Sequence, residues 1–475
     1  MNKVLRFPLS LKLRFFRANA LVVMGTSKNF SFSRFPYDKL EIPYGCPCII
    51  FDLYAILFFM NKISENKEYM NRLLERFIKY VKIWSESDGN AADKGIFPST
   101  NRQWDIARTL ESDLKELGMS DVQVTKDCYV YARLPANFDC TDSTLFLAHM
   151  DTVDEVTGKD VKPQVFEDYD GRDITLANGV VHTTKADENL EQAAANRETI
   201  ITTDGTTLLG GDDKAGVSAI MAMLEYFYEN PQENHINIEV IFSPDEETGH
   251  GMDKVPLELI KSKYAYTVDG GNLGELESEC FNAWAAEVTF TGKATHTGDA
   301  KKGGMVNAVS MAGLFLTNLP KAMAPETTQN YEGFIAPMEV EGSIDSCKVQ
   351  LLLRSFLPDE IERQKCIVSD CAEAAAISFN GKKEIKFKQQ YVNMKEKLDK
   401  HPDVLEKLRA AYKAAGVTPV EKPIRGGTDG SRLTELGIPC PNIFTGGHKY
   451  HSRYEWVSLN QMAKAADILI NIVGE

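Results

Sequence analysis

Residues 212–242 have the sequence DDKAGVSAIMAMLEYFYENPQENHINIEVIF. Apolar side chains between Val217 and Phe227 recur every three or four positions, which is the spacing of one face of an α-helix. The apolar run from Ile236 to Phe242 that follows is typical of a buried strand. A helix followed directly by a strand is the repeating unit of α/β domains, so this stretch predicts a mostly parallel sheet flanked by helices.

The same alternation extends to both sides of this unit. Helical spacing begins near Met70 and continues from Leu73 to Trp84. Thr100 and Gln103 have the spacing of a capping box, which predicts a helix that ends at Gly118. Further strands are expected at Tyr129–Ala132, Thr144–Ala148 and Tyr264–Val268.

Two regions interrupt the alternation. Residues 154–198 are polar and irregular, and we expect a long surface insertion there. Between about 281 and 384, β-type alternation surrounds a helix-like segment, which predicts a smaller α+β domain inserted into the first. The predicted division is an extension over residues 1–60, a main domain formed by 61–280 and 391–475, and an inserted domain over 281–390.

The composition is that of an ordinary globular protein. At 475 residues the chain can hold two or three domains, and 43% hydrophobic with 25% charged residues is typical of soluble proteins. A net charge of −15 opposes the phosphate backbone, so we expect no nucleic-acid partner. Nine scattered cysteines, an odd number, argue against a disulfide framework and favour the reducing cytoplasm.

The first 60 or so residues differ from the rest. The apolar run from Cys48 to Met60 carries Asp52 and is shorter than the roughly 20 residues needed to cross a bilayer. It also lies too far into the chain for a secretory signal. A disordered tail, a weak targeting segment and upstream codons wrongly included in the protein are three readings of this extension. We favour the last, because globular periodicity starts near Met70, and we expect no membrane partner.

Four groups of acidic or histidine residues follow predicted strands. They are His149-Met150-Asp151, Asp212-Asp213-Lys214, Glu246-Glu247 and Asp269. In open α/β sheets, ligands gather at the carboxyl ends of the strands. Because side chains two apart on an extended segment share a face, the Asp151 carboxylate can hold the ring nitrogen of His149 that a metal leaves free. One carboxylate of the Glu246-Glu247 pair can bind a metal while the other stays free as a base.

Each group alone has an ordinary explanation. Asp212 and Asp213 could simply cap a helix, because acids in the first turn suit the helix dipole. His149 could end a strand without binding anything, and Asp269 could belong to a turn. The coincidence of four such groups at four strand ends favours a metal centre.

A further candidate ligand lies late in the chain, in the loop from Gly446 to His451. Both His448 and His451 are present in this loop, and chemistry alone does not choose between them. A mixed set of nitrogen and carboxylate ligands suits zinc, although manganese or cobalt could occupy the same set.

Seven stretches of the chain together form a family pattern. They begin at residues 149, 203, 245, 268, 325, 424 and 445, and their sequences are HMDTV, TDGTTLLGGDDKAG, DEETG, VDGG, PETT, IRGGTDG and TGGHKYH. In this order they resemble the M20 family of metallopeptidases, and within it the branch that cleaves tripeptides. The resemblance covers the chain from about Met70 to the end, and residues 1 to about 60 have no counterpart in the family.

The resemblance implies a zinc-exopeptidase fold with two zinc ions per subunit. It implies that His149 and Asp269 bind one zinc ion, and that Glu247 and His451 bind the second. It also implies that Asp212 bridges the two ions. In this family the ligand aligns with His451 rather than with the earlier histidine of that loop.

The resemblance implies further roles around the metals. Asp151 would orient the first histidine ligand, and Glu246 would be the general base. The inserted domain would act as a lid, from which His296 and Arg354 face the metals. Thr297 stands where the family has a proline, which puts the rigidity of that loop in question but leaves its chemistry unchanged.

These roles imply removal of the N-terminal residue from tripeptides, by attack of a zinc-bridging hydroxide on the first peptide bond. An acidic site attracts the protonated peptide N-terminus, and the C-terminal carboxylate needs a cation such as Arg354 or Arg425. Arg425 could instead be a surface residue paired with a neighbouring acid. The competing functions are a dipeptidase or N-acyl-amino-acid deacylase of the same family, and a catalytically silent scaffold. Both a monomer and a homodimer are open, because the inserted domain serves dimer contacts in some members.

Overall fold

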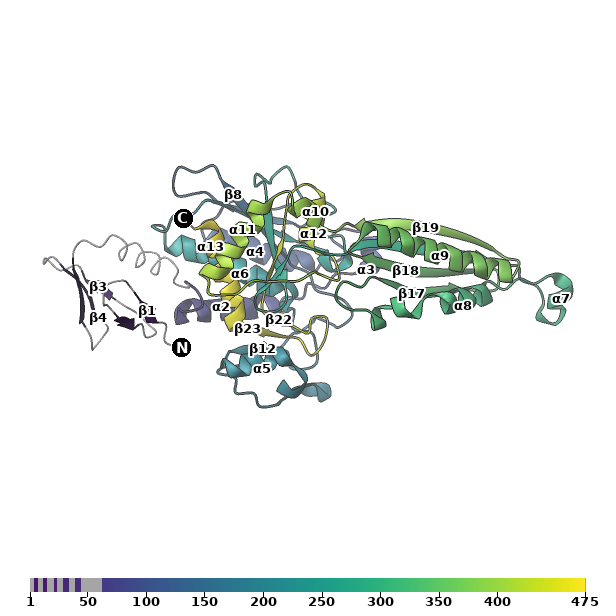
Figure 1. Ribbon diagram of the computed structural model, residues 1–475, viewed down its shortest axis with the longest axis horizontal. Coiled ribbons are helices and arrows are strands. Elements are labelled where there is room, and N and C mark those ends of the chain that lie inside the picture. Colours follow the sequence, from purple (N-terminus) through teal and green to yellow (C-terminus); the bar gives the residue numbers. More distant parts are fainter. Residues whose placement is uncertain are drawn as a thin grey trace. The chain divides into compact units, whose positions relative to one another are not determined.

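The computed structural model describes residues 62–474 and, of the first 61, only the backbone of five short strands (Figure 1). The chain divides into two compact units, Met1–Met60 and Asn61–Glu475. In the first unit two antiparallel sheets are formed by β1 (Val4–Arg6) with β2 (Lys12–Arg14), and by β3 (Leu21–Val23), β4 (Asn29–Ser33) and β5 (Lys39–Pro43). The other predictions made for residues 1–60 lie outside the described residues.

The second unit contains an eight-stranded central sheet. Its strands, in spatial order, are β20 (Val420–Glu421), β15 (Glu275–Glu277), β21 (Asn442–Phe444), β14 (Ala265–Gly270), β8 (Ser143–His149), β13 (Asn237–Ser243), β7 (Val130–Leu134) and β6 (Ser120–Val124). The four neighbours β21, β14, β8 and β13 run parallel, and β6 and β7 extend the sheet in antiparallel fashion. The predicted mostly parallel sheet is therefore confirmed.

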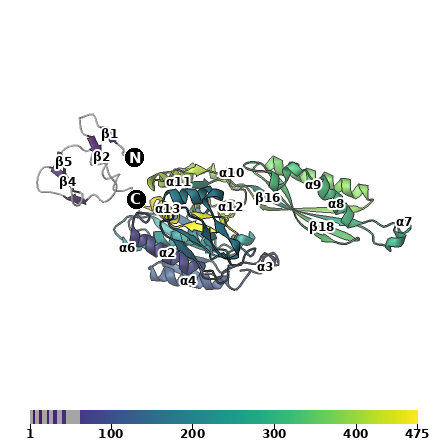
Figure 2. The same ribbon diagram turned by 90° about the horizontal axis from the view of Figure 1, so that it is seen from below.

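Both faces of this sheet are covered, because its central strands are apolar on both sides (Figures 1 and 2). In β8, Phe146 and Ala148 pack in the larger core, whereas Leu145 and Leu147 pack in a second core with Leu433 of α12 (Asp429–Glu435). Helices of the larger core are α2 (Lys67–Val81), α4 (Gln103–Glu116), α6 (Gly211–Glu229), α11 (Pro402–Ala414) and α13 (Leu459–Val473).

Helix α6 is buried around its circumference rather than on one face. Almost every residue from Gly211 to Phe227 is buried. The reason is that α6 contacts strands β8 and β14 as well as helices α2 and α13. The helix that was predicted as amphipathic therefore forms the centre of the larger core.

Helix α4 begins at Gln103, but the predicted capping box is wrong. Thr100 Oγ1 donates to the carbonyl of Glu86 (2.7 Å), and Gln103 Nε2 donates to Asp245 Oδ1 (2.6 Å). The residue that precedes the helix, Arg102, makes no side-chain capping bond. Tertiary partners thus take the groups that the capping box would use.

A smaller domain is formed by an antiparallel four-stranded sheet. Its strands, in spatial order, are β17 (Phe334–Gly342), β18 (Ser346–Ser355), β16 (Asn282–Thr291) and β19 (Lys382–Tyr391). Helices α8 (Ala308–Asn318) and α9 (Pro358–Ser378) cover one face and share its core (Figure 2). The short helix α7 (Ala300–Gly303) lies at the end of this domain that points away from the central sheet (Figure 1). The predicted smaller α+β domain is confirmed.

The predicted surface insertion, residues 154–198, has more structure than expected. It contains β9 (Gln164–Phe166), β10 (Ile174–Thr175), β11 (Val181–His182) and α5 (Glu188–Ala195). Strand β9 joins a four-stranded sheet with β12 (Ile200–Thr202), β23 (Trp456–Ser458) and β22 (Gly447–His448). These strands have two or three residues, which is too short for a periodicity signal. The insertion therefore packs beside the late histidine loop.

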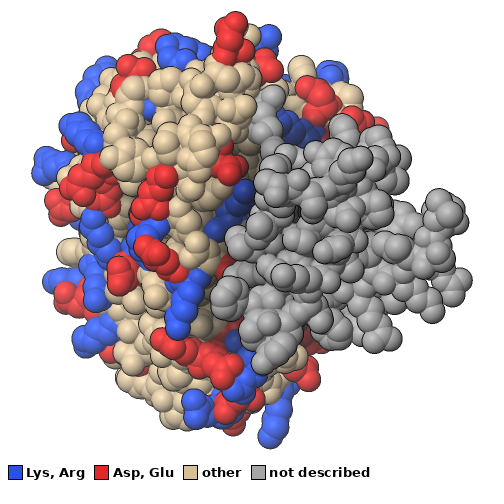
Figure 3. Space-filling view, turned by 90° about the vertical axis from the view of Figure 1, so that its left-hand side faces the viewer, with Lys and Arg blue, Asp and Glu red and all other residues tan. Residues whose placement is uncertain are grey.

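The remaining elements are short. They are α3 (Gly89–Asp93), α10 (Lys395–Leu398) and the 3₁₀ turns η1 (Ala177–Gly179), η2 (Thr184–Ala186), η3 (Glu246–Thr248), η4 (Thr297–Asp299), η5 (Lys321–Met323) and η6 (Pro325–Thr327). On the face seen in Figure 3, acidic and basic side chains are interspersed over the described surface. Among helices of the described residues, none has the length and apolar character to cross a bilayer.

Candidate metal centre

The carboxyl ends of the four parallel strands meet at one edge of the central sheet. His149 is the last residue of β8, and Asp269 lies near the end of β14. Glu246 and Glu247 form the turn after β13, and His451 follows β21 in the late loop. The parallel arrangement therefore gathers residues that are far apart in the sequence.

Asp212 reaches this edge from the start of α6. Its neighbour Asp213 accepts the backbone N–H of Gly216 (3.1 Å) and of His149 (3.3 Å), so Asp213 caps the helix. A side chain at Gly216 would place its Cβ 1.8 Å from the carbonyl oxygen of Val268. Glycine at this position lets α6 approach β14 closely, and Asp212 is left facing the gathered residues.

The first cluster consists of His149, Asp212 and Asp269. His149 Nε2 lies 2.9 Å from Asp212 Oδ1 and 3.6 Å from Asp269 Oδ1. One donor atom from each of the three residues lies within 4.8 Å of the others, which is a spacing that can hold a metal ion. His149 is buried, and the side chains of Asp269 and Asp212 are 9% and 15% exposed, so the three groups have little contact with water.

The second cluster consists of Asp212, Glu247 and His451. His451 Nε2 lies 3.1 Å from Asp212 Oδ2 and 3.2 Å from Glu247 Oε2. These three residues also meet the spacing for a metal ion. Asp212 thus directs one carboxylate oxygen to each cluster, as a bridging ligand would.

The two histidines of the late loop have different surroundings. His448 is buried, stacks on Trp456 with ring centroids 4.0 Å apart, and lies near Asn272 Oδ1 (2.9 Å) and Gln461 Oε1 (3.3 Å). Burial lowers the pKa of His448 to about 4, so the ring is neutral. The structure therefore brings His451, and not His448, to the clusters.

Asp151 contacts more than its predicted partner. Its carboxylate lies 3.5 Å from Nδ1 of His149, but the same ring nitrogen is closer to the Asp151 carbonyl oxygen (3.2 Å). The two carboxylate oxygens accept the backbone N–H groups of Glu246 (3.0 Å) and Glu247 (3.2 Å). Asp151 thus connects the first histidine to the turn that carries both glutamates.

Glu246 lies beside the clusters without belonging to either of them. One oxygen of Glu246 is 4.0 Å from His149 Nε2. Burial raises the pKa of Glu246 well above its usual value; His149 opposes this shift, and Asp269 and Asp429 add to it. A raised pKa makes the Glu246 carboxylate a stronger base, as a general base requires.

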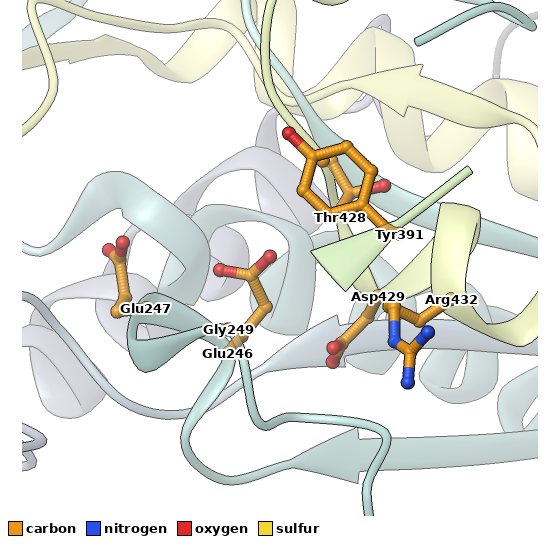
Figure 4. A pocket seen from close by; sticks show the side chains of 8 residues that line it. Glu246, Glu247, Gly249, Tyr391, Thr428, Asp429 and Arg432 are labelled. Carbon is orange, nitrogen blue, oxygen red and sulfur yellow. The ribbon is translucent and has the colours of Figure 1, made fainter. Parts of the chain in front are cut away.

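A pocket of about 230 Å³ opens next to Glu246 (Figure 4). Its lining residues are Glu246, Glu247, Gly249, Tyr391, Gly427, Thr428, Asp429 and Arg432. In Figure 4 the Glu246 carboxylate lies between that of Glu247 on one side and Tyr391, Asp429 and Arg432 on the other.

The clusters have the character of a cation site. Glu247 Oε1 is buried and has no hydrogen-bond partner among the described residues. Burial raises the pKa of Glu247 to about 8, with the Asp212 charge adding to the shift, and burial raises that of Asp269 to about 6. Such crowding of acids is relieved by bound cations, and the imidazole and carboxylate donors suit zinc, manganese or cobalt. The residues present therefore fit two divalent ions.

The structure leaves three predicted substrate residues away from the clusters. His296 is exposed on the small domain, directly before η4 and α7, and its Nδ1 accepts the N–H of Gly298. Arg354 is buried at the end of β18, where it donates to the carbonyls of Trp284 and Leu353 and lies over the ring of Tyr391. Through that tyrosine, Arg354 borders the pocket.

Arg425 joins the two domains. Its guanidinium donates to the carbonyls of Asn330 (2.8 Å) and Glu332 (2.7 Å) and to Thr328 Oγ1 (3.0 Å). It also lies over the rings of Phe281 and Phe334. The predicted alternative of a pairing with a neighbouring acid is not what the structure shows, because backbone carbonyls take its donors.

Three pocket residues were not predicted from the sequence. Asp429 and Arg432 belong to α12, and Asp429 is within the IRGGTDG stretch, which was a signal for it. Asp429 accepts a hydrogen bond from Ser243, and Gly251 leaves room for its carboxylate. Tyr391 ends β19, and nothing in its sequence surroundings points to a pocket.

The chain belongs to peptidase family M20/M25/M40, whose family model matches residues 202–475. It is therefore an enzyme, a hydrolase of the M20 metallopeptidase class, and the resemblance noted in the sequence is confirmed. Among its relatives is Peptidase T of Geobacillus thermodenitrificans (strain NG80-2), which is 43% identical over 84% of this chain and 97% of the relative. Peptidase T of Alkaliphilus oremlandii (strain OhILAs) is 40% identical over 85% of this chain and 99% of the relative.

Solved structures share the fold. Aminopeptidase PepT from Bacillus cereus ATCC 10987 has a TM-score of 0.64 at 23% identity and covers 85% of this chain and 98% of its own. A tripeptidase from Staphylococcus aureus subsp. aureus Mu50 has a TM-score of 0.67 at 22% identity, covering 85% and 97%. A dinuclear metal-binding peptidase of the M20 family from Bacillus subtilis has a TM-score of 0.58 at 14% identity, covering 86% and 98%.

Proposed function

We propose that the protein is an aminopeptidase that releases the N-terminal residue from tripeptides. The observation that carries the proposal is the position of Asp212, whose two oxygens lie 2.9 Å from His149 and 3.1 Å from His451, with Glu246 beside them. In a two-metal hydrolase, one carboxylate is shared between the two metal sites, and a second acid that binds no metal lies beside them. Relatives named Peptidase T, and a fold shared with a tripeptidase, support the substrate class.

Two zinc ions per subunit would be held by the two clusters. His149 and Asp269 would bind one ion, Glu247 and His451 the other, and Asp212 both. The buried and unpartnered oxygen of Glu247 supports this assignment. Zinc bound there supplies Lewis-acid chemistry, because it polarises a carbonyl and lowers the pKa of water toward neutrality.

Glu246 would take the proton from the attacking water and give it to the leaving amine, a role typically worth about 10²–10⁴-fold in rate. Its raised pKa suits a group that must hold a proton between these two transfers. Asp151 would keep Glu246 in place, because it accepts the backbone N–H groups of both glutamates in the turn.

The ends of the peptide would be recognised by charge. Glu246 and Asp429 line the pocket and would attract a protonated N-terminus. Arg354, next to Tyr391, would face the substrate from the small domain, together with His296. His296 is exposed on the far loop, so the small domain would have to act as a lid that closes during turnover. Arg425 would reach a peptide carboxylate only by exchanging its present carbonyl partners.

The proposal extends to the setting of the enzyme. In the proposed division, residues 281–390 would be the lid, 61–280 and 391–475 the catalytic domain, and 1–60 an extension. A cytoplasmic location is supported by the cysteines of the described residues, which are all free thiols. A homodimer formed through the small domain would be seen as twice the chain mass in light scattering of the purified protein.

The decisive assay measures release of free amino acid from an unblocked tripeptide, a dipeptide and an N-acetylated tripeptide. Zinc-loaded protein should cleave the free tripeptide, and the Glu246→Ala variant should retain zinc but lose activity. Cleavage of the acetylated peptide alone would reassign the protein to the deacylases, and preference for the dipeptide would make it a dipeptidase. A wild-type protein that binds zinc but cleaves none of them would be a scaffold.

A further inference from the structure

Glu455 is a buried carboxylate that lies four residues after His451. Its side chain is 1% exposed, and its two oxygens accept four consecutive backbone N–H groups. Oε2 accepts from Leu209 (2.7 Å) and Gly210 (3.0 Å), and Oε1 accepts from Gly211 (2.6 Å) and, at 3.3 Å, from the next residue, Asp212.

The loop from Leu209 to Asp212 is built around this carboxylate. Consecutive N–H groups that converge on one point form an anion-binding concavity. Gly210 has φ +82°, a conformation that side chains rarely adopt, and a Cβ on Gly211 would lie 3.0 Å from Glu455 Oε1 and 2.5 Å from Val457. The glycines of the loop therefore make room for the glutamate.

This contact joins the two segments that carry the shared ligand and its late partner. Asp212 ends the loop that Glu455 holds, and His451 comes from the segment that leads into Glu455 and β23. Strand β23 in turn pairs with β12, which precedes the Asp212 loop in the chain. Asp212 and His451 are 239 positions apart in the sequence. The hydrogen bonds of a single side chain, that of Glu455, connect the two segments that carry them.

We infer that Glu455 is a positioning residue, which fixes the Asp212 carboxylate relative to His451 and thereby sets the affinity of the second metal cluster. The inference rests on the proposed two-metal site and adds a residue that belongs to neither ligand cluster. A carboxylate suits this position because an amide of the same shape would turn an NH₂ group toward two of the four donors.

The test is the Glu455→Gln variant of the full chain, compared with wild type by competition for Zn²⁺ against a chromophoric chelator. Wild type should bind two zinc ions. The variant should bind at least one of them about 10–100-fold more weakly, which is the usual effect of losing a group that holds a metal ligand in place.

Glu198→Gln is the matched control. Glu198 is also buried, and it accepts hydrogen bonds from Ser458 Oγ (2.6 Å) and Gln461 Nε2 (3.0 Å) beside the same small sheet. It does not hold the Asp212 loop. Its loss should lower the melting temperature while zinc affinity stays at the wild-type value.

The outcomes separate the possibilities. Unchanged affinity in Glu455→Gln, or an equal loss in Glu198→Gln, would reduce Glu455 to a structural residue and overturn the inference. Wild-type protein that binds no zinc would overturn the proposed function, and the inference with it.

If the Glu455→Gln protein does not fold, the inference is tested by the rate of backbone amide hydrogen exchange in metal-free wild-type protein. Slow exchange at residues 209–212 is expected, because Glu455 holds their amides without metal. Exchange there as fast as in the exposed loop before α7 would contradict the inference.

Discussion

Asp151 shows how one side chain can serve two predicted functional groups. Its carboxylate lies near the ring of His149 and accepts the N–H groups of Glu246 and Glu247. The sequence pattern indicated the first contact, because the two residues are two positions apart on an extended segment. The second contact depends on the path of β13, which no local pattern reveals.

Replacing Asp151 by Asn should impair catalysis while the chain stays folded. The amide accepts only one of the two backbone N–H groups well, so the Glu246–Glu247 turn loses a partner. We expect kcat/KM for a tripeptide to fall by about 10–100-fold. Asp168→Asn, at an exposed pair with Arg197, is the control and should leave kcat/KM unchanged. Equal activity in both variants would contradict the role of Asp151.

His182 gives a pH prediction. It is 1% exposed, neither ring nitrogen has a hydrogen-bond partner among the described residues, and it packs edge-on against Tyr454. Burial, with Lys449 adding to it, lowers the pKa of His182 to about 4. Between an unfolded pKa of about 6.5 and pH 4, the unfolded chain binds a proton that the folded chain does not. The contribution of neutral His182 to the free energy of unfolding is therefore complete above about pH 6.5. It falls by up to about 3 kcal/mol as the pH decreases to 4.

His182→Phe should remove this loss. At pH 7 the variant should be as stable as wild type or more so, because a buried polar group without a partner is replaced by an apolar ring. Urea unfolding of both metal-free proteins at pH 7 and pH 4.5 measures the effect. A difference between the two pH values that is as large in the variant as in wild type would rule out His182 as its source.

Among the secondary-structure elements, the sequence predicted the long strands and not the short ones. The apolar runs that predicted strands at 129–132, 144–148, 236–242 and 264–268 correspond to β7, β8, β13 and β14, because a strand buried on both faces has a continuous apolar signal. Strands β9 to β12 have two or three residues each. β10 and β11 pair with each other across a short turn, whereas β9 pairs with β12 and β12 also pairs with β23, far away in the chain. Strands this short give no periodic signal, so residues 154–198 were predicted as irregular.

The candidate site was predictable to the same extent. His149, Glu247 and Asp269 lie at the ends of long strands, and Asp212 begins the helix α6. His451 follows the three-residue strand β21, and only the family resemblance chose it over His448. The structure brings all five residues together. Tyr391 reaches the pocket only because the small domain meets the central sheet there, and Glu455 depends on a loop more than 200 residues earlier. Contacts of this kind leave no periodic trace in the sequence.

The close approach of helix α6 to strand β14 can be tested with Gly216→Ala. The added methyl group would lie 1.8 Å from the carbonyl oxygen of Val268 and 2.5 Å from Asp213 Oδ1, so the helix must move. We expect the free energy of unfolding to fall by about 1–3 kcal/mol or more. Gly313→Ala in α8 is the control, since its Cβ meets nothing within 4 Å, and it should raise stability by about 0.5–1 kcal/mol. Urea unfolding that shows no loss for Gly216→Ala would contradict the packing.

At the scale of the whole molecule, Arg425 is one of the described residues that tie the small domain to the central one. Its partners Asn330 and Glu332 belong to the small domain, and its own loop leads into α12 and the pocket. The geometry favours a role for Arg425 as a contact between the domains, whereas the sequence favoured a role as an anchor for the substrate carboxylate. The two roles predict different effects of an Arg425 substitution on kcat and KM.

Arg425→Ala should lower kcat and raise KM together, because residues at a moving joint affect both constants. A tripeptide and the same tripeptide with an amidated C-terminus should be affected equally. Arg409→Ala, which breaks an exposed pair with Glu421, is the control and should change neither constant. An increase in KM alone, confined to the free carboxylate, would instead establish Arg425 as the substrate anchor.

The contact between Asp212 and His451 also sets the order in which the enzyme is completed during synthesis. The two residues are 239 positions apart, and ribosomes add about 5–20 residues per second, so His451 is made roughly 10–50 s after Asp212. His149, Asp212 and Asp269 are all synthesised before the small domain begins, whereas the second cluster waits for the late loop. The nascent chain therefore contains all three residues of the first cluster before it contains His451, and the second cluster can be completed only when that last ligand has been made.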